Sequence, residues 1–345
     1  MAGALCDTAP GVIAHAADRP PSRWRRFARH RVAVVSAVAL AAATGVCVAS
    51  LPFSARWYDV QSLDTAVRHA PSATPAVAYA RFVGVRDAVA GPHGVEAVAY
   101  GVSSWLGHDD LGRSVVYRLL PGFVVSLAIG LAAAGVALMI GVPFGSVAAL
   151  AGGRVDAVMM RVVDGLYGLP YLLMVILLRI ALTGPLTAVF GDSVRTAQIV
   201  ILLVAIGGVS WLTPARVVRG QVLSLRSRAF VEAARAAGAG PMWILRRHVL
   251  PNLVGPIVVY GSLVVPQAIL QEAFLSYLGL GVQQPIPSLG RLAADGVEAV
   301  NTFVAFWWLL VFPCGALVLT LLALNFIGDG LRDALDPGAG RAGVG

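Results

Sequence analysis

Six long apolar segments constrain this chain more than any other feature of its sequence. A helix needs about 20 apolar residues to cross the hydrocarbon core of a membrane. Lipid cannot pair with free backbone N–H and C=O groups, so such segments must be helical. The sequence therefore predicts an all-α membrane protein with six transmembrane helices, at residues 32–53, 123–150, 162–182, 196–215, 253–272 and 303–327. Pro170 is expected to kink the third helix.

The composition agrees with a membrane protein and excludes one kind of chemistry. Of the 345 residues, 58% are hydrophobic and only 13% are charged, whereas soluble domains are about 25% charged. All 26 basic residues are arginine. A standard ATP-binding P-loop needs a lysine, so we expect no ATPase site and no cofactor in this chain. The three cysteines lie far apart, without disulfide or metal-site spacing.

The placement of arginine predicts the orientation and the domain organisation. Seventeen of the 26 arginines fall in the two tails and in the loops on one side, and cytoplasmic segments carry the excess of basic residues. We therefore expect both termini to be cytoplasmic. The predicted division is a basic tail at 1–31, the first helix at 32–53, an external segment at 54–118, a five-helix core at 119–329 containing a cytoplasmic loop at 216–251, and a cytoplasmic tail at 330–345.

A polar, arginine-rich hairpin interrupts the apolar pattern between the fourth and fifth helices. Ser227 can cap its first helix, Gly238 suits the left-handed position that ends that helix, and Pro241 suits the start of a second helix that runs to His248. This loop contains seven arginines and a single acidic residue, Glu232. The excess of positive charge favours an acidic partner or anionic lipid headgroups. The alternative is an ordinary basic loop at a membrane surface.

Apolar side chains in the hairpin suggest a docking element. Phe230, Met242, Trp243 and Ile244 are expected to form a compact apolar plug. We expect Met242 and Trp243 to contact a partner, although Trp243 also suits anchoring at the membrane interface.

The order of residues in the hairpin resembles a known family. Glu232, Ala233 and Ala234 are followed after three residues by Gly238, and after nine more by His248-Val249-Leu250-Pro251. This pattern resembles the EAA loop of bacterial ABC importer permeases, in which isoleucine stands at the position of His248. Other segments agree in order with the peptide-importer branch, namely LGHDDLGR at 106–113, FLSYLGLG at 274–281, PIPSLG at 285–290 and GDGLRDALDP at 328–337. The chain is similar to the second ("C-type") permease subunit of dipeptide/oligopeptide importers over about residues 104–337.

This resemblance implies a type I ABC importer permease in the bacterial cytoplasmic (inner) membrane. The implied partners are a second homologous permease, one or two cytoplasmic ABC ATPases that use ATP and magnesium, an external substrate-binding protein and membrane lipid, with no nucleic acid. Glu232 is expected to pair with Arg228 or Arg235, or to contact the ATPase, and not to act as a catalytic acid. The implied ATPase-coupling residues are Glu232, Ala233, Ala234, Gly238, Pro241, Met242, Trp243 and Pro251.

Two charged residues in the predicted spans are candidates for the translocation path. Ionisable side chains inside a membrane are costly and often line a water-filled pathway. Arg179 either faces the pore, where it would attract a peptide carboxylate, or snorkels to the interface. Glu272 is expected to pair locally or to cap the turn that follows it, and a role in the gate stays open.

Other functions remain as alternatives. Related permeases import nickel or other small solutes, and the sequence does not identify the cargo. A proton-driven secondary transporter would need buried acids with relay partners, and the predicted spans hold only Asp164 and Glu272. A membrane-embedded enzyme is disfavoured because no HExxH motif or Ser/His/Asp set appears at a readable spacing.

Overall fold

The computed structural model describes residues 27–28, 30–58, 105–109, 111–190, 194–300 and 306–335. Within these ranges all named elements are helices, which confirms the all-α prediction. Six of the helical segments are long and apolar enough to cross a membrane, namely Arg31–Ala55, Val115–Ala151, Tyr171–Phe190, Ala197–Arg226, Pro241–Tyr277 and Trp307–Leu335. Most of the predicted external segment and both tails lie outside the described residues, so the structure does not test those predictions.

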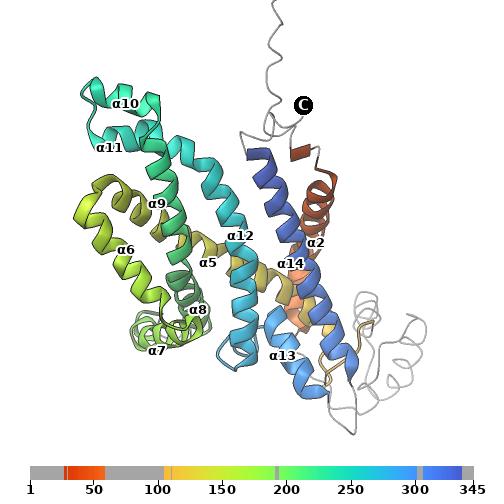
Figure 1. Cartoon of the computed structure of the whole chain (residues 1–345). Coiled ribbons are helices and arrows are strands. Elements are labelled where there is room, and N and C mark those ends of the chain that lie inside the picture. Colours follow the sequence, from red (N-terminus) through yellow and green to blue (C-terminus); the bar gives the residue numbers. More distant parts are fainter. Residues whose placement is uncertain are drawn as a thin grey trace, which may run out of the picture.

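The long helices lie side by side around α5 (Val115–Ala151), which packs against α2 (Arg31–Trp57), α8 (Val194–Ser210), α9 (Leu212–Arg226) and α12 (Leu250–Tyr277) (Figure 1). Small residues allow this close packing. A Cβ on Gly130 of α5 would lie 2.5 Å from a side-chain carbon of Ile269 on α12. The last helix, α14 (Trp307–Leu335), packs on α12 and α2.

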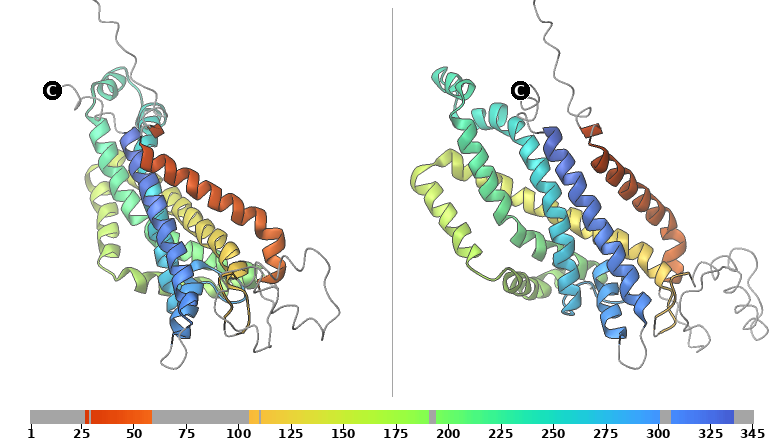
Figure 2. Two further views of the ribbon diagram at one scale, coloured as in Figure 1. Left: turned by 90° about the vertical axis from the view of Figure 1, so that its right-hand side faces the viewer. Right: turned by 45° about the vertical axis from the view of Figure 1, so that its right-hand side comes forward.

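Polar elements occupy the two ends of this bundle. The short helices α10 (Ala229–Ala236) and α11 (Pro241–Ile244) project at the end where α2 begins and α14 finishes (Figures 1 and 2). The amphipathic helix α13 (Leu289–Ala299) lies at the opposite end, packed against α14, α12 and α5. The hairpin and the described ends of the chain therefore share one side of the protein.

The third predicted span is broken in the structure, and the fourth is irregular at one residue. The segment 162–182 is not one kinked helix: α6 (Gly153–Tyr167) ends before Pro170 and α7 (Tyr171–Phe190) begins after it. Proline disfavours a helical conformation in the residue before it, and Gly168 closes the last turn of α6. α6 runs along the bundle, whereas α7 lies across the end opposite the hairpin (Figures 1 and 2). The fourth span remains one helical segment, Ala197–Arg226, with a turn at Trp211 where α8 passes into α9.

Several helices extend beyond their predicted limits. α5 begins at Val115, inside the predicted external segment 54–118, and α14 reaches Leu335, inside the predicted tail 330–345. α9 continues to Arg226, so the first third of the predicted loop 216–251 belongs to a helix of the bundle. The sequence at these ends is polar, so a prediction from hydropathy assigns it to loops. A helix can nevertheless continue through polar residues beyond its apolar part.

Candidate functional site

The turn of the hairpin is fixed by backbone hydrogen bonds around Gly238. Gly238 has φ of +84°, a left-handed conformation that residues with a Cβ rarely adopt. Its N–H donates to the carbonyl of Arg235 at 3.0 Å, and the N–H of Ala239 donates to the carbonyl of Ala234 at 3.0 Å. These two bonds form a Schellman motif. The predicted conformation of Gly238 is therefore confirmed, and it sets the direction in which the chain leaves α10.

The second arm of the hairpin is continuous with the fifth span. Pro241 occupies the first turn of α11, as predicted, with Gly240 as the N-cap. α11 passes into a π-helix, η2 (Leu245–Val249), and then directly into α12. Pro251, near the start of α12, cannot donate to the carbonyl one turn back, and the wider π-turn precedes it. The Asn252 side chain donates to the carbonyl of His248 at 2.6 Å. The segment Pro241–Tyr277 is thus one helical rod.

The inner face of the hairpin is packed against the bundle. Val231 of α10, Ile244 of α11 and Val249 of η2 are at most 4% exposed. They join a hydrophobic cluster with residues of α5 and α9, among them Ala149 and Val222. Ile244 is therefore part of the attachment to the bundle, and the prediction that it joins Phe230, Met242 and Trp243 in one compact apolar plug is wrong.

The outer face of the hairpin presents large apolar side chains to its surroundings. Phe230, Met242 and Trp243 are 42%, 54% and 53% exposed. The His248 ring lies 5.1 Å from the Trp243 ring and 6.0 Å from the Phe230 ring, measured between centroids. A hollow of about 660 Å³ opens here, lined by Phe230, Ala234, Ala237, Gly238, Ala239, Gly240, Trp243 and His248. Such an apolar face bordered by polar residues is typical of an interaction site.

The charges of the hairpin differ from the prediction in two ways. Glu232 is exposed and makes no ion pair among the described residues, so the predicted pairs with Arg228 and Arg235 are absent there. Ser227 does not cap α10, because its hydroxyl donates to the carbonyl of Ser224 at 3.1 Å and Arg228 is the N-cap. Ala233 is exposed beside Glu232 and leaves that face of α10 thin.

Three of the seven loop arginines bind within the chain, a feature that sequence reasoning missed. Arg219 makes two hydrogen bonds to the Asp156 carboxylate of α6, at 2.5 and 2.6 Å. This interaction lowers the pKa of Asp156 below its usual value. Arg216 pairs with Asp164 at 2.5 Å, and Arg226 donates to a backbone carbonyl at the end of α5. The other four loop arginines, Arg228, Arg235, Arg246 and Arg247, are exposed and make no ion pair among the described residues.

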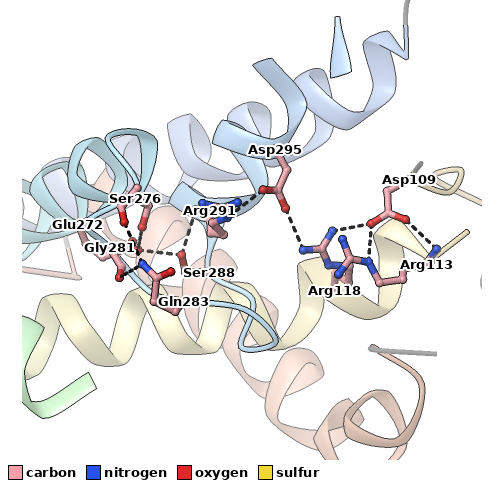
Figure 3. Close-up of polar contacts among 11 residues, drawn as sticks. Asp109, Arg113, Arg118, Glu272, Ser276, Gly281, Gln283, Ser288, Arg291 and Asp295 are labelled. Atoms are coloured by element: carbon pink, nitrogen blue, oxygen red, sulfur yellow. Dashed lines mark hydrogen bonds and ion pairs between the residues drawn. The ribbon is translucent and has the colours of Figure 1, made fainter. Parts of the chain in front are cut away.

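A second polar cluster lies at the opposite end of the bundle (Figure 3). Arg118 of α5 pairs with Asp109 at 2.8 Å and with Asp295 of α13 at 3.0 Å. Arg113 also pairs with Asp109, at 2.7 Å, and Arg291 with Asp295, at 2.9 Å. These residues border a cavity of about 410 Å³. Arg118 and Asp295 are 177 residues apart in the sequence, and nothing in the local sequence indicated that they would meet.

The two candidates for the translocation path occupy different environments. Arg179 lies on α7, partly buried, and its Nη1 has no hydrogen-bond partner among the described residues. Glu272 lies on α12, is 0% exposed and accepts hydrogen bonds from serine side chains. Glu272 therefore pairs locally, one of the two predicted possibilities, and no hydrogen bond or ion pair joins it to Arg179.

Comparison with known proteins identifies relatives over most of this fold. Residues 141–341 match the family described as "Binding-protein-dependent transport system inner membrane component". The chain is 45% identical over 233 residues to the dipeptide transport system permease protein DppC of Bacillus subtilis, covering 68% of each protein. It is 47% identical over 233 residues to the oligopeptide transport system permease protein OppC of Escherichia coli K12, covering 68% of this chain and 72% of that protein.

A solved structure shares the fold at low sequence identity. A chain of the methionine ABC transporter MetNI, in an inward-facing conformation, superposes with a TM-score of 0.50 at 20% identity. The match covers 64% of this chain and 97% of that one. The arrangement of helices is therefore that of a type I ABC importer permease.

Proposed function

Because this multi-pass membrane chain belongs to the family of binding-protein-dependent transport system inner membrane components, with peptide permeases of the OppC and DppC type as relatives, we propose that it carries peptides across the bacterial cytoplasmic membrane. In this proposal it forms half of a pore with a second, homologous permease. ATP and magnesium are used by separate cytoplasmic ATPase subunits, and an external binding protein delivers the substrate.

The hairpin is the proposed contact with the ATPase. One observation carries this assignment: the outer face of the hairpin exposes Met242 and Trp243, while the same arm continues without a break into the fifth span. The full set of proposed coupling residues is Glu232, Ala233, Ala234, Gly238, Pro241, Met242, Trp243 and Pro251. Exposed Arg246 and Arg247 favour an acidic rim on the partner.

The proposed mechanism is a rigid-body movement. When the ATPase subunits close on ATP, they displace the hairpin, and the packed cluster around Val231 and Ile244 prevents the hairpin from bending independently. The rod Pro241–Tyr277 then transmits the displacement through the membrane. Packed helices pass on such a rotation, whereas a flexible loop would absorb it. In this orientation the hairpin and both termini face the cytoplasm.

Arg179 is proposed to face the translocation path. Its guanidinium is partly buried, and its Nη1 has no partner in the described part of the chain. A peptide carries a carboxylate that would satisfy this charge. Glu272, in contrast, is enclosed by protein, and its role is structural rather than direct contact with the cargo.

Reconstitution of the complete assembly tests the function. The chain would be co-expressed with its second permease and ATPase, purified, and sealed into vesicles with the external binding protein. We expect the ATPase to co-purify, and tri-alanine uptake to require ATP and to resist a protonophore. Uptake of nickel without uptake of peptides would contradict the proposed substrate. Uptake without ATP that collapses with the protonophore would instead support a secondary transporter.

A further inference from the structure

Glu272 is an unusual carboxylate because the protein encloses it without a cation. Its side chain is 0% exposed, and no ion pair to it occurs in the described residues. Burial of a charged group is costly unless hydrogen bonds replace water. Both carboxylate oxygens have such bonds: Oε1 accepts from the hydroxyls of Ser276 and Ser288, each at 2.7 Å, and Oε2 accepts from Ser126 at 3.2 Å.

The three serines belong to three different parts of the fold. Ser126 is on α5, Ser276 is one turn further along α12, and Ser288 is the N-cap of α13 (Figure 3 shows the latter two beside Glu272). Ser126 also accepts a hydrogen bond from the backbone N–H of Leu289 at 2.9 Å. Glu272 thus joins the external helix α13 to both α5 and α12.

The direction of these hydrogen bonds requires an acceptor at position 272. Ser288 accepts from the N–H of Arg291 at 3.1 Å, so its own proton is directed to Glu272. Ser126 likewise accepts from Leu289 and gives its proton to Glu272. A glutamine has the same size but only one carbonyl oxygen. Its NH₂ group would replace either Oε1, the acceptor for Ser276 and Ser288, or Oε2, the acceptor for Ser126, so at least one hydroxyl would lose its acceptor.

Close packing supports the polar junction. A Cβ on Gly290, in the first turn of α13, would lie 2.9 Å from the Cβ of Ala273 on α12. A Cβ on Gly281 would collide with the Ser276 side chain. At Gly290 no wider side chain separates α13 from α12, and at Gly281 the loop between them lies directly against the end of α12, so α13 has little room to slide against α12.

The other end of the same rod carries the hairpin. Trp243 and Glu272 both lie in the continuous helical segment Pro241–Tyr277, Trp243 in α11 and Glu272 near the C-terminal end of α12. We propose that Glu272 is a positioning residue for transport: it fixes α13 to the rod, so the outer surface around α13 moves as one body with the hairpin. This inference rests on the proposed function.

The test combines a distance with a coupling ratio in the complete assembly. Spin labels would be placed on cysteines at Leu270 of α12 and Val297 of α13, both exposed in this chain, after replacement of Cys6, Cys47 and Cys314 by alanine. We expect one narrow distance distribution, with and without trapped ATP. In Glu272→Gln we expect a broader distribution with a second population, and a fall of about fivefold in tri-alanine uptake per ATP hydrolysed, while hydrolysis without the binding protein stays unchanged.

Two further variants keep the test decisive. Ser288→Ala removes one donor and leaves the carboxylate, so it should reproduce both effects more weakly even where Glu272→Gln assembles poorly. Ser262→Ala is the matched control, because Ser262 is also on α12 but, among the described residues, its hydroxyl donates only to the carbonyl of Val259. A narrow distribution and a normal coupling ratio in both Glu272→Gln and Ser288→Ala would overturn the inference. Absence of ATP-dependent uptake by the unmodified assembly would instead overturn the proposed function, and the distances would still test the junction.

Discussion

Trp243 and Glu272 lie on one uninterrupted helical rod, one near each end of it. The Trp243 side chain is 53% exposed on the hairpin, whereas Glu272 is fully enclosed by α5, α12 and the start of α13. The rod therefore has a free end suited to a partner and an anchored end suited to transmit movement. This arrangement connects the two polar regions that lie on opposite sides of the bundle.

Gly238→Leu should uncouple transport without unfolding the spans. The left-handed conformation at Gly238 costs a residue with a Cβ about 1–2 kcal/mol, so the Schellman turn would rearrange and the arms of the hairpin would change their angle. We expect the variant to reach the membrane at normal levels, with ATP-dependent tri-alanine uptake reduced at least fivefold. Gly220→Ala is the control, because Gly220 lies on α9 outside the hairpin and has open space around it. Normal uptake by Gly238→Leu would contradict the coupling role.

Trp243→Ala should weaken binding of the ATPase and leave the fold intact. An exposed tryptophan in a protein interface commonly contributes about 2 kcal/mol or more, which corresponds to roughly 30-fold weaker binding. The measurement is the affinity of the purified ATPase for the permease pair in nanodiscs. Leu223→Ala on α9 is the comparison, since Leu223 is also exposed and apolar but lies outside the hairpin. Equal affinities for the two variants would remove Trp243 from the interface.

Asp156→Asn should lower stability by the same amount across the neutral pH range. Because Arg219 holds the pKa of Asp156 below 3.8, the pair is fully formed above that pH and is lost only as the pH falls further. We expect a loss of about 1 kcal/mol, equal at pH 5, 6.5 and 8, in thermal unfolding in detergent. Asp164→Asn should cost less, because the Asp164–Arg216 pair is largely exposed. A loss that disappears between pH 8 and pH 5 would contradict the assigned ion pair.

Arg179→Leu should alter transport according to the charge of the cargo. A hydrogen-bonded charge contributes about 1.5–3 kcal/mol, so uptake of tri-alanine with a free carboxylate is expected to fall by roughly tenfold. The amidated peptide lacks that carboxylate and should enter equally well through the variant and the unmodified assembly. Unchanged uptake of tri-alanine by the variant, relative to the unmodified assembly, would assign Arg179 to the membrane interface instead of the translocation path.

The sequence predicts the elements whose signals are local. Apolar length placed α2, α5, α12 and α14, and glycine and proline placed the turn at Gly238 and the start of α11. The sequence predicts a kink at Pro170 where the structure has a complete break between α6 and α7. The apolar segment continues across Pro170, but the helical backbone does not. The position of Ser227 was misjudged because α9 extends through Arg226 and uses Ser227 to finish its own last turn.

The side-chain contacts of the candidate sites cannot be predicted from neighbouring residues in the sequence. Ser126 meets Glu272 across 146 residues and Arg118 meets Asp295 across 177, and such pairs depend on the packing of whole helices. The predicted partners of Glu232 also failed for a physical reason. An ion pair between a glutamate and a neighbouring arginine on an exposed helix adds little stability in water. Proximity in the sequence therefore does not ensure that the two side chains pair.

Photo-crosslinking from position 243 tests the central claim most directly. A photoreactive amino acid would replace Trp243 in the complete assembly, with the same residue at Val297 on α13, at the opposite end of the bundle, as the comparison. The account predicts an adduct between position 243 and the ATPase, and none between position 297 and the ATPase. An adduct between position 243 and the external binding protein would place the hairpin on the wrong side of the membrane and contradict the account.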